Sequence, residues 1–157
     1  GGFLLSHRCA EIKPNDLVQS WLRHLAAQLV APRRTVIIGL NKKSGTRCVL
    51  FDPVPAAEDQ LASLLDLYWQ GLRAPLKFFP KSAHAFATGM RRLATSEDVN
   101  PKQLAMREWE GNDFSPAEAE DPHFKICFSN DPDPLDSEFE QIAGRVFEPL
   151  FKAEVES

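Results

Sequence analysis

Two short runs of β-branched and apolar residues, joined by a polar segment that ends in glycine, most constrain how this chain folds. The runs cover residues 35–40 and 47–51, and residues 41–45 lie between them. Such runs favour strands, and a short polar connection with glycine favours a hairpin. Pro53 and Pro55 end the second strand, because proline cannot donate a ladder hydrogen bond. We therefore expect a β-hairpin here.

Helical periodicity surrounds this hairpin. A helix is expected over residues 17–30, with Asn15 or Asp16 as its N-cap, and another over residues 58–72. Further helices are expected from Ser82 to about Leu93, from Pro101, and from Ser137 past Leu150, with short strands at 76–79 and 124–128. The expected buried faces are Val18, Trp21, Leu22, Leu25 and Leu29; Leu61, Leu64, Leu65, Tyr68 and Leu72; Phe86, Met90 and Leu93; Leu104 and Trp109; and Phe139, Ile142, Ala143, Val146, Phe147 and Leu150.

Composition limits the class of protein. With 157 residues and a hydrophobic content of 43%, the chain suits one globular domain with a sizeable core. It contains no run of about 18 apolar residues, so no membrane span is expected. Three widely spaced cysteines without CxxC spacing argue against a disulfide framework or a zinc ribbon, and the cytoplasm is the expected compartment.

Charge is distributed unevenly along the chain. The overall charge of −4 combines a net basic segment, residues 1–95, with a net acidic segment, residues 96–157. We expect an α/β core over the first segment and an acidic helical extension, packed on that core, over the second. The basic segment would attract phosphate backbones. In the alternative interpretation the uneven charge has no binding role, and the acidic segment is a surface that only aids solubility.

Three stretches in order resemble the C-terminal part of the RecC family. The first is LYWQGLRAPL at residues 67–76, leading into FPKSA at 79–83. The second is WEGN at 109–112, followed by Asp121-Pro122. The third is Pro134-Leu135-Asp136, followed by VFEPL at 146–150.

The resemblance implies a fold and a cellular role. It implies an α+β fold related to the PD-(D/E)xK nucleases, with extra C-terminal helices, whose core is a helix, a strand hairpin, a helix and a further strand. RecC proteins are subunits of the RecBCD helicase–nuclease, an ATP-dependent exodeoxyribonuclease V that processes double-strand ends. Partners would be RecB-like and RecD-like subunits, DNA ends and single strands, and the C-terminal domain would be a nuclease that has lost its active site.

The carboxylates that such a nuclease needs are scarce here. Mg²⁺ prefers several oxygen ligands, which clustered acids supply. The first hairpin strand has no acid, and Asp52 stands alone after the second, with Val54 and Pro55 following in place of a Glu-x-Lys. We expect no catalytic residue, metal or other cofactor in this domain, and expect the Asp52 side chain to cap a turn. ATP would be used by other parts of the complex.

Basic residues gather at or beside the hairpin. These are Arg33, Arg34, Lys42, Lys43 and Arg47, and a second basic set, Arg73, Lys77 and Lys81, follows the next helix. If the hairpin projects, its five cations have no acid between them and suit the backbone of a DNA strand, without sequence preference. The competing interpretation is a solvated loop.

Other candidate residues favour structural roles. His24 and His84 fall inside predicted helices without a nucleophile signature, so we expect ordinary helix histidines. In the resemblance, Tyr68 and Gln70 occupy the helix where active relatives carry a supporting Gln–Tyr motif, but Tyr68 falls on the apolar face and is expected in the core. Trp69 lies off that face and is the best candidate for an exposed aromatic.

Three functional hypotheses follow. The first, which we favour, is a non-catalytic domain that scaffolds subunits and guides DNA in double-strand break repair. The second is an active Mg²⁺-dependent nuclease centred on Asp52, with Glu58 or Asp59 joining it. The third is a protein–protein module whose basic loop never meets DNA. Cleavage assays separate the second from the others, and charge reversal at Lys42 and Lys43 separates the first from the third.

Overall fold

The computed structural model describes residues 2–41, 45–112 and 115–155. The chain forms two compact units. The first contains Gly1–Tyr68 and Pro149–Ser157, and the second contains Trp69–Glu148. The unit boundaries fall within two helices, α2 (Ala57–Gly71) and α6 (Ser137–Ala153). The expected division at residue 95 rests on charge and resemblance, and it stays a prediction.

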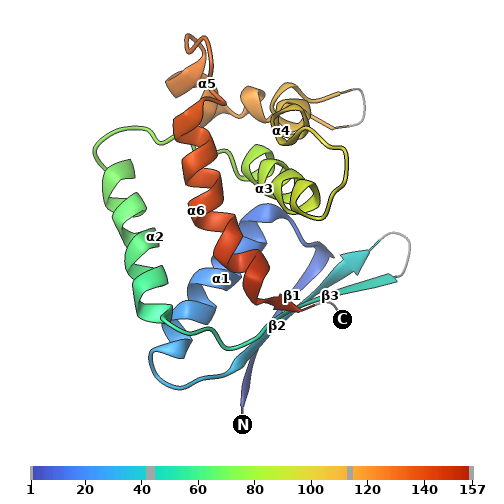
Figure 1. The fold of residues 1–157 in the computed structure, drawn as a ribbon, viewed down its shortest axis with the longest axis vertical. Coiled ribbons are helices and arrows are strands. Elements are labelled where there is room, and N and C mark those ends of the chain that lie inside the picture. Colours follow the sequence, from blue (N-terminus) through green and yellow to red (C-terminus); the bar gives the residue numbers. More distant parts are fainter. Residues whose placement is uncertain (1, 42–44, 113–114, 156–157) are drawn as a thin grey trace. The chain divides into compact units, whose positions relative to one another are not determined.

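The first unit contains a mixed four-stranded sheet in the order β1-β2-β3-β4. Strands β2 (Arg34–Asn41) and β3 (Gly45–Phe51) pair antiparallel, which confirms the predicted hairpin. Figure 1 shows them as the two long cyan arrows. Strand β1 (Phe3–Glu11), which the sequence pattern did not predict, pairs parallel with β2, and the two-residue β4 (Glu154–Val155) pairs antiparallel with β3.

Helix α1 (Pro14–Gln28) connects the parallel strands β1 and β2, because a parallel pair needs a crossover. The predicted N-cap was wrong: the helix begins at Pro14, and the Asp16 carboxylate accepts a hydrogen bond from the Lys13 backbone N–H at 2.8 Å. The predicted apolar face was also partly wrong, since Leu22 is exposed and Leu29 lies beyond the helix. The residues of α1 that are buried are Leu17, Ser20, Trp21, His24 and Leu25.

Alternating side chains of the sheet supply the rest of this core. Thr35, Ile37, Val49 and Phe51 are each at most 2% exposed. They point to one face because side chains in a strand alternate between the two faces. Gly39 lies on the same face, where a Cβ atom would stand 2.5 Å from Ile12 Cγ1. The lack of a Cβ atom at Gly39 therefore leaves room for the Ile12 side chain to pack against the strand.

Helix α2 forms where predicted, but its buried face is rotated from the predicted one. Ala57 and Leu67 are its buried residues. Leu65, Tyr68 and Leu72 are about half exposed or more, so the prediction of a core tyrosine was wrong. The cause is that leucines occupy more than one side of this helix, and periodicity alone does not select the side that packs.

The second unit is helical. Its elements are α3 (Pro80–Ala94), α4 (Pro101–Glu110), the 3₁₀ helix η1 (Glu118–Glu120), α5 (Pro122–Phe128) and residues 137–148 of α6. Helices α3 and α4 approach closely at Gly89, where a Cβ atom would stand 2.7 Å from Pro101 Cα. Met90 and Leu93, expected to be buried in α3, are each 48% exposed, whereas all six predicted residues of α6 are buried.

Phe79 is the centre of an aromatic cluster in this unit. It is fully buried, and its ring centroid lies 4.3 Å from that of Trp109 and 5.0–6.0 Å from those of Phe124, Phe128 and Phe139. Both predicted strands here were wrong: residues 76–79 are irregular, and residues 124–128 belong to α5. Phe124 and Phe128 are one helical turn apart, so both reach Phe79 from the same side of a helix.

The fold is α+β, with the four-stranded mixed sheet and six α-helices in the described part of the chain. The helix–hairpin–helix order expected from the resemblance is present as α1, β2, β3 and α2. The further strand expected after α2 is not formed. Among the residues described, no helix combines the length and apolar character needed to cross a membrane.

Candidate functional site

Asp52, the carboxylate considered for metal binding, lies at the base of the hairpin and is paired with an arginine. Arg34 Nε stands 2.6 Å from Asp52 Oδ1. The backbone N–H of Asp52 donates to the Ala153 carbonyl at 3.0 Å, which holds the residue beside β4. The Asp52 side chain therefore neutralises a guanidinium of the neighbouring strand, and its expected role as a turn cap stays a prediction.

His24 lies in the core close to this pair. Its Nδ1 is 2.9 Å from Thr35 Oγ1, and its ring stacks on Trp21 with centroids 5.3 Å apart. Burial lowers the pKa of His24, and a hydrogen bond with the backbone of Asp52 and the charge of Asp52 only partly offset this effect. A neutral, hydrogen-bonded imidazole is a structural group, as expected for His24. His84 lies half-buried against Phe147, with ring centroids 5.3 Å apart.

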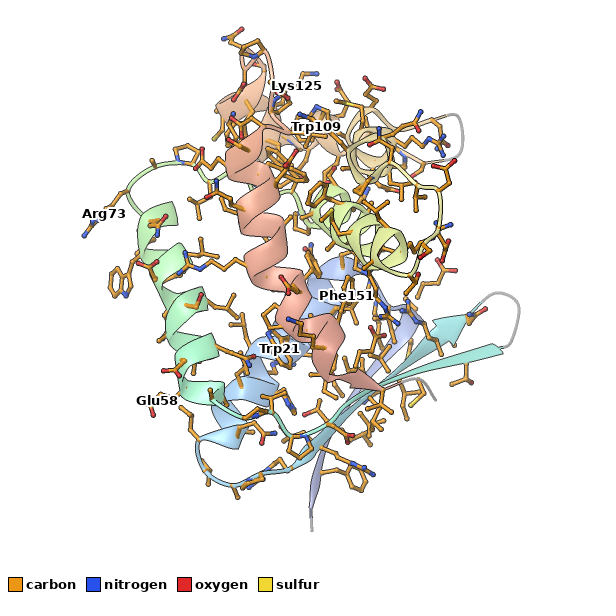
Figure 2. The ribbon with its side chains drawn as sticks, in the orientation of Figure 1. Trp21, Glu58, Arg73, Trp109, Lys125 and Phe151 are labelled. Atoms are coloured by element: carbon orange, nitrogen blue, oxygen red, sulfur yellow. The ribbon has the colours of Figure 1, made fainter. Side chains whose placement is uncertain are left out.

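The fit of Asp52 to a divalent cation is poor. Mg²⁺ needs several oxygen ligands, and Asp52 offers a carboxylate that already balances Arg34. Glu58 and Asp59, the acids considered as helpers, are exposed in the first turn of α2, and Figure 2 shows Glu58 extending away from the ribbon. Within residues 2–41, 45–112 and 115–155, no three His, Cys, Asp or Glu side chains are grouped to hold a metal ion.

Among the described residues of the predicted basic set at the hairpin, Arg34 and Arg47 lie on opposite faces of the sheet. Arg34 points away from the core, because its neighbour Thr35 points into it, whereas Arg47 lies opposite Gly39 on the core-facing side. The two arginines are also separated by five strand residues, or roughly 17 Å. Arg33 is half-buried and its Nε donates to the Ala31 carbonyl at 3.3 Å. Lys42 and Lys43 lie outside the described residues.

These positions change the charge pattern expected of the hairpin. No acid lies between the five basic residues in the sequence, but Asp52, which follows the second strand, balances the charge of Arg34. Arg47 lies near the connection that contains Lys42 and Lys43, since Asn41 pairs with Gly45 in the hairpin register. A DNA-binding role for this set stays a prediction.

Lys77, from the second basic set, is enclosed by acidic groups instead of facing solvent. Its Nζ lies 2.7 Å from both Asp131 Oδ2 and Asp136 Oδ2, and 3.1 Å from the Asp133 carbonyl. Burial acts to lower the pKa of Lys77, but the hydrogen bonds to Asp131 and Asp136 outweigh it and raise this pKa. The same hydrogen bonds lower the pKa of Asp131 and of Asp136. Lys77 therefore ties residues 131–136 in place.

The two other members of that set differ from Lys77. Arg73 is exposed after α2, and Figure 2 shows its side chain pointing away from the ribbon. Lys81 uses its backbone: its N–H donates to Glu118 Oε1 at 2.9 Å. Glu118 is a buried carboxylate that the sequence pattern did not identify. It caps a helix that begins 36 residues earlier in the chain, and no short-range residue spacing indicates such a contact.

The aromatic candidates divide as follows. Trp69 is 61% exposed, which confirms its predicted exposure, and Tyr68 beside it is 59% exposed. Trp21 and Trp109 are buried, as expected for core tryptophans.

The chain was compared with models of protein families and with curated proteins. Residues 2–91, more than half of the chain, match the family model described as the RecC C-terminal domain. A search of curated proteins found no match.

Proposed function

The chain belongs to the RecC C-terminal domain family, and we propose that it is a non-catalytic domain that scaffolds subunits and guides DNA. Family membership implies a role as part of a RecBCD subunit in DNA repair, with RecB and RecD subunits as partners. The finer role proposed here is that this domain leaves cleavage and ATP hydrolysis to other parts of the complex, in the cytoplasm.

The Arg34–Asp52 pair is the observation that carries the non-catalytic proposal. A nuclease of the PD-(D/E)xK type uses clustered carboxylates to bind Mg²⁺ and activate water. In this chain a guanidinium stands 2.6 Å from the hairpin carboxylate, where its positive charge repels a cation. The helix–hairpin–helix order of α1, β2, β3 and α2 supports descent from such a nuclease core whose catalytic acids have been lost.

A cleavage assay tests this proposal. The purified chain is incubated with Mg²⁺ or Mn²⁺ and an end-labelled single strand, and we expect no product. Asp52→Asn and the matched control Asp98→Asn, at an exposed aspartate outside the candidate site, should behave identically. Metal-dependent cleavage that Asp52→Asn abolishes and Asp98→Asn preserves would establish the nuclease hypothesis and overturn ours.

The loop end of the hairpin is the proposed DNA-guiding element. Arg47 lies there, and Lys42 and Lys43 belong to the connection between the two strands. Three cations at one end of a hairpin release counterions from a phosphate backbone and bind without reading sequence. Arg33 and Arg34 belong to the opposite end, and Arg34 is balanced by Asp52.

Charge reversal in the assembled complex tests the guiding role. We expect Lys42→Glu with Lys43→Glu to weaken DNA binding several-fold and to reduce its salt dependence. Lys125→Glu, which changes an exposed cation of α5, is the control and should leave DNA affinity unchanged. If the double reversal also leaves affinity unchanged, the domain is a protein–protein module only.

A further inference from the structure

Each of the two units has a buried core of its own. In the first unit, α1 and the sheet supply Trp21, Ile37 and Phe51, which are at most 2% exposed. In the second unit, Phe79 and Trp109 are buried together, with ring centroids 4.3 Å apart. Each unit therefore contains the apolar burial that a separately folding body requires.

Helix α6 carries the chain from the second unit back into the first. Its residues 137–148 belong to the second unit, and the first unit resumes at Pro149. Figure 1 shows α6 as one unbroken helix that leads into the short C-terminal strand. A continuous helix couples what it joins, because its residues are hydrogen-bonded from one turn to the next. The strength of this coupling therefore depends on the hydrogen bonds at the boundary.

Pro149 weakens these hydrogen bonds at the boundary itself. Proline has no backbone N–H, so Pro149 cannot donate to the carbonyl of Arg145, and its ring crowds that turn. This removes one of the hydrogen bonds that join residues 149–152 to the preceding turn. A helix commonly ends before a proline, and proline is well tolerated at the first position of a helix. The boundary is thus the place where α6 divides most readily.

The chain on either side of Pro149 is held by different units. Phe147 meets the ring of His84 in the second unit edge to face, with centroids 5.3 Å apart. On the other side, the Ala153 carbonyl accepts a hydrogen bond from the backbone N–H of Asp52 in the first unit at 3.0 Å. Strand β4 follows and pairs with β3. The proline therefore lies between an anchor in one core and an anchor in the other.

The other connection between the units, at α2, also permits separate opening. Helix α2 ends at Gly71, so only its residues 69–71 belong to the second unit. Its last turn closes at Gln70, whose carbonyl accepts the N–H groups of Arg73 and Ala74. Residues 75–79 then have irregular backbone. An opening that begins after this turn leaves the hydrogen bonds of α2 in place.

We propose that Pro149 divides the chain into two cooperative units, each of which opens and recloses without unfolding the other. When the second unit opens, α6 ends at Glu148, and residues 149–155 remain on β3. Such an opening has a free energy below that of complete unfolding. The inference concerns the fold alone and goes beyond the proposed function, because it holds whatever the domain binds.

Amide hydrogen exchange of the purified chain, followed by mass spectrometry, measures the opening of each unit separately. Glu118→Ala removes the cap of α3 and so destabilises the second unit. We expect exchange in α3 and α4 to rise at least about tenfold, and exchange in β2 and β3 to change less than about twofold. A comparable rise in both places means that the units open together, and it overturns the proposal.

A second substitution perturbs the same core by a different route. Trp109→Ala removes a buried ring whose centroid lies 4.3 Å from that of Phe79. If this variant unfolds the second unit outright, we expect β2 and β3 to retain their protection from exchange. Loss of that protection together with that of α3 and α4 overturns the proposal.

Restoring the helix at the boundary tests the role of Pro149. Pro149→Ala supplies the missing N–H, and in this background Glu118→Ala should raise exchange in β2 and β3 at least about fivefold. Gly144→Ala is the control background. It also favours helix in α6 and its Cβ atom meets nothing within 4 Å, so β2 and β3 should stay insensitive to Glu118→Ala. If β2 and β3 respond equally in the two backgrounds, Pro149 is not the break, and the proposal is wrong.

Discussion

Glu118 accepts two hydrogen bonds from Ser82, one from its backbone N–H and one from its hydroxyl, both at 2.8 Å. Its other oxygen accepts the Lys81 backbone N–H, so one buried carboxylate satisfies two N–H groups of the first turn of α3. The first N–H groups of a helix have no partner within it, and a carboxylate there also interacts favourably with the helix dipole. A residue of η1 thus serves as the cap of α3.

Replacing this cap should destabilise the second unit. We expect Glu118→Ala to lower the free energy of unfolding by roughly 2 kcal/mol, because it leaves buried donors without a partner. Glu120→Ala removes an exposed glutamate of the same 3₁₀ helix, paired with Lys125, and should cost less than about 0.5 kcal/mol. Urea denaturation of both variants gives the comparison, and equal losses would contradict the assigned role of Glu118.

His24 should make stability depend on pH. Burial lowers its pKa in the folded state below the ordinary value of 6.5, so the unfolded chain takes up a proton first as pH falls. The free energy of unfolding should therefore be higher at neutral pH than below pH 6.5, and it should decrease as pH falls from 6.5 toward the folded-state pKa of His24. Urea denaturation at a series of pH values measures the slope, and NMR titration assigns it to this imidazole. His123→Gln, at an exposed residue of α5, should retain the slope. A His24 pKa above 6.5 would contradict the prediction.

Lys77 should contribute more to stability than an ordinary surface lysine. Lys77→Met leaves Asp131 and Asp136 without the ammonium that joins them, and we expect a loss of roughly 1–3 kcal/mol. Lys125→Met, which breaks an exposed pair with Glu120, should cost less than about 0.5 kcal/mol. Thermal unfolding of the two variants compares their losses of stability. A loss for Lys77→Met no larger than that for Lys125→Met would show that the ion pairs of Lys77 with Asp131 and Asp136 add no stability beyond that of an exposed pair.

The same cluster should weaken in acid. Lys77 lowers the pKa of Asp131 and of Asp136 in the folded state below the ordinary value of 3.8. Their stabilising contribution is therefore present above pH 3.8 and is lost as pH falls toward the folded pKa values. We expect Lys77→Met to flatten the acid limb of a stability–pH curve. An unchanged acid limb would mean that other carboxylates control it.

Gly39 should resist substitution. A Cβ atom there would lie 2.5 Å from Ile12 Cγ1 and 3.0 Å from the Ala10 carbonyl oxygen, so Gly39→Ala should destabilise the chain by roughly 1–3 kcal/mol. At Gly144 in α6 nothing lies within 4 Å of such an atom, and Gly144→Ala should be neutral or stabilising by up to about 1 kcal/mol. The free energies of unfolding of the two variants test this contrast.

Local elements were predictable from the sequence because local chemistry specifies them. The hairpin follows from β-branched runs around a polar, glycine-ended connection, and α6 follows from a long apolar stripe with charged residues opposite. Asp52 could also be identified as an isolated acid. Strand β1 was missed because its half-buried side includes Ser6 and Arg8, which weakens the apolar alternation that signals a strand.

The sequence by itself determined the hairpin, the helices on either side of it and the long C-terminal helix, and that clustered acids are missing from the hairpin strands. Only the tertiary structure decided which helix faces are buried, that residues 124–128 form a helix against Phe79, and which partners Asp52, Lys77 and Glu118 have. The physical reason is the distance along the chain over which each effect acts. Propensity and periodicity act over one or two turns, whereas an ion pair or a helix cap joins residues tens of positions apart once the chain has folded.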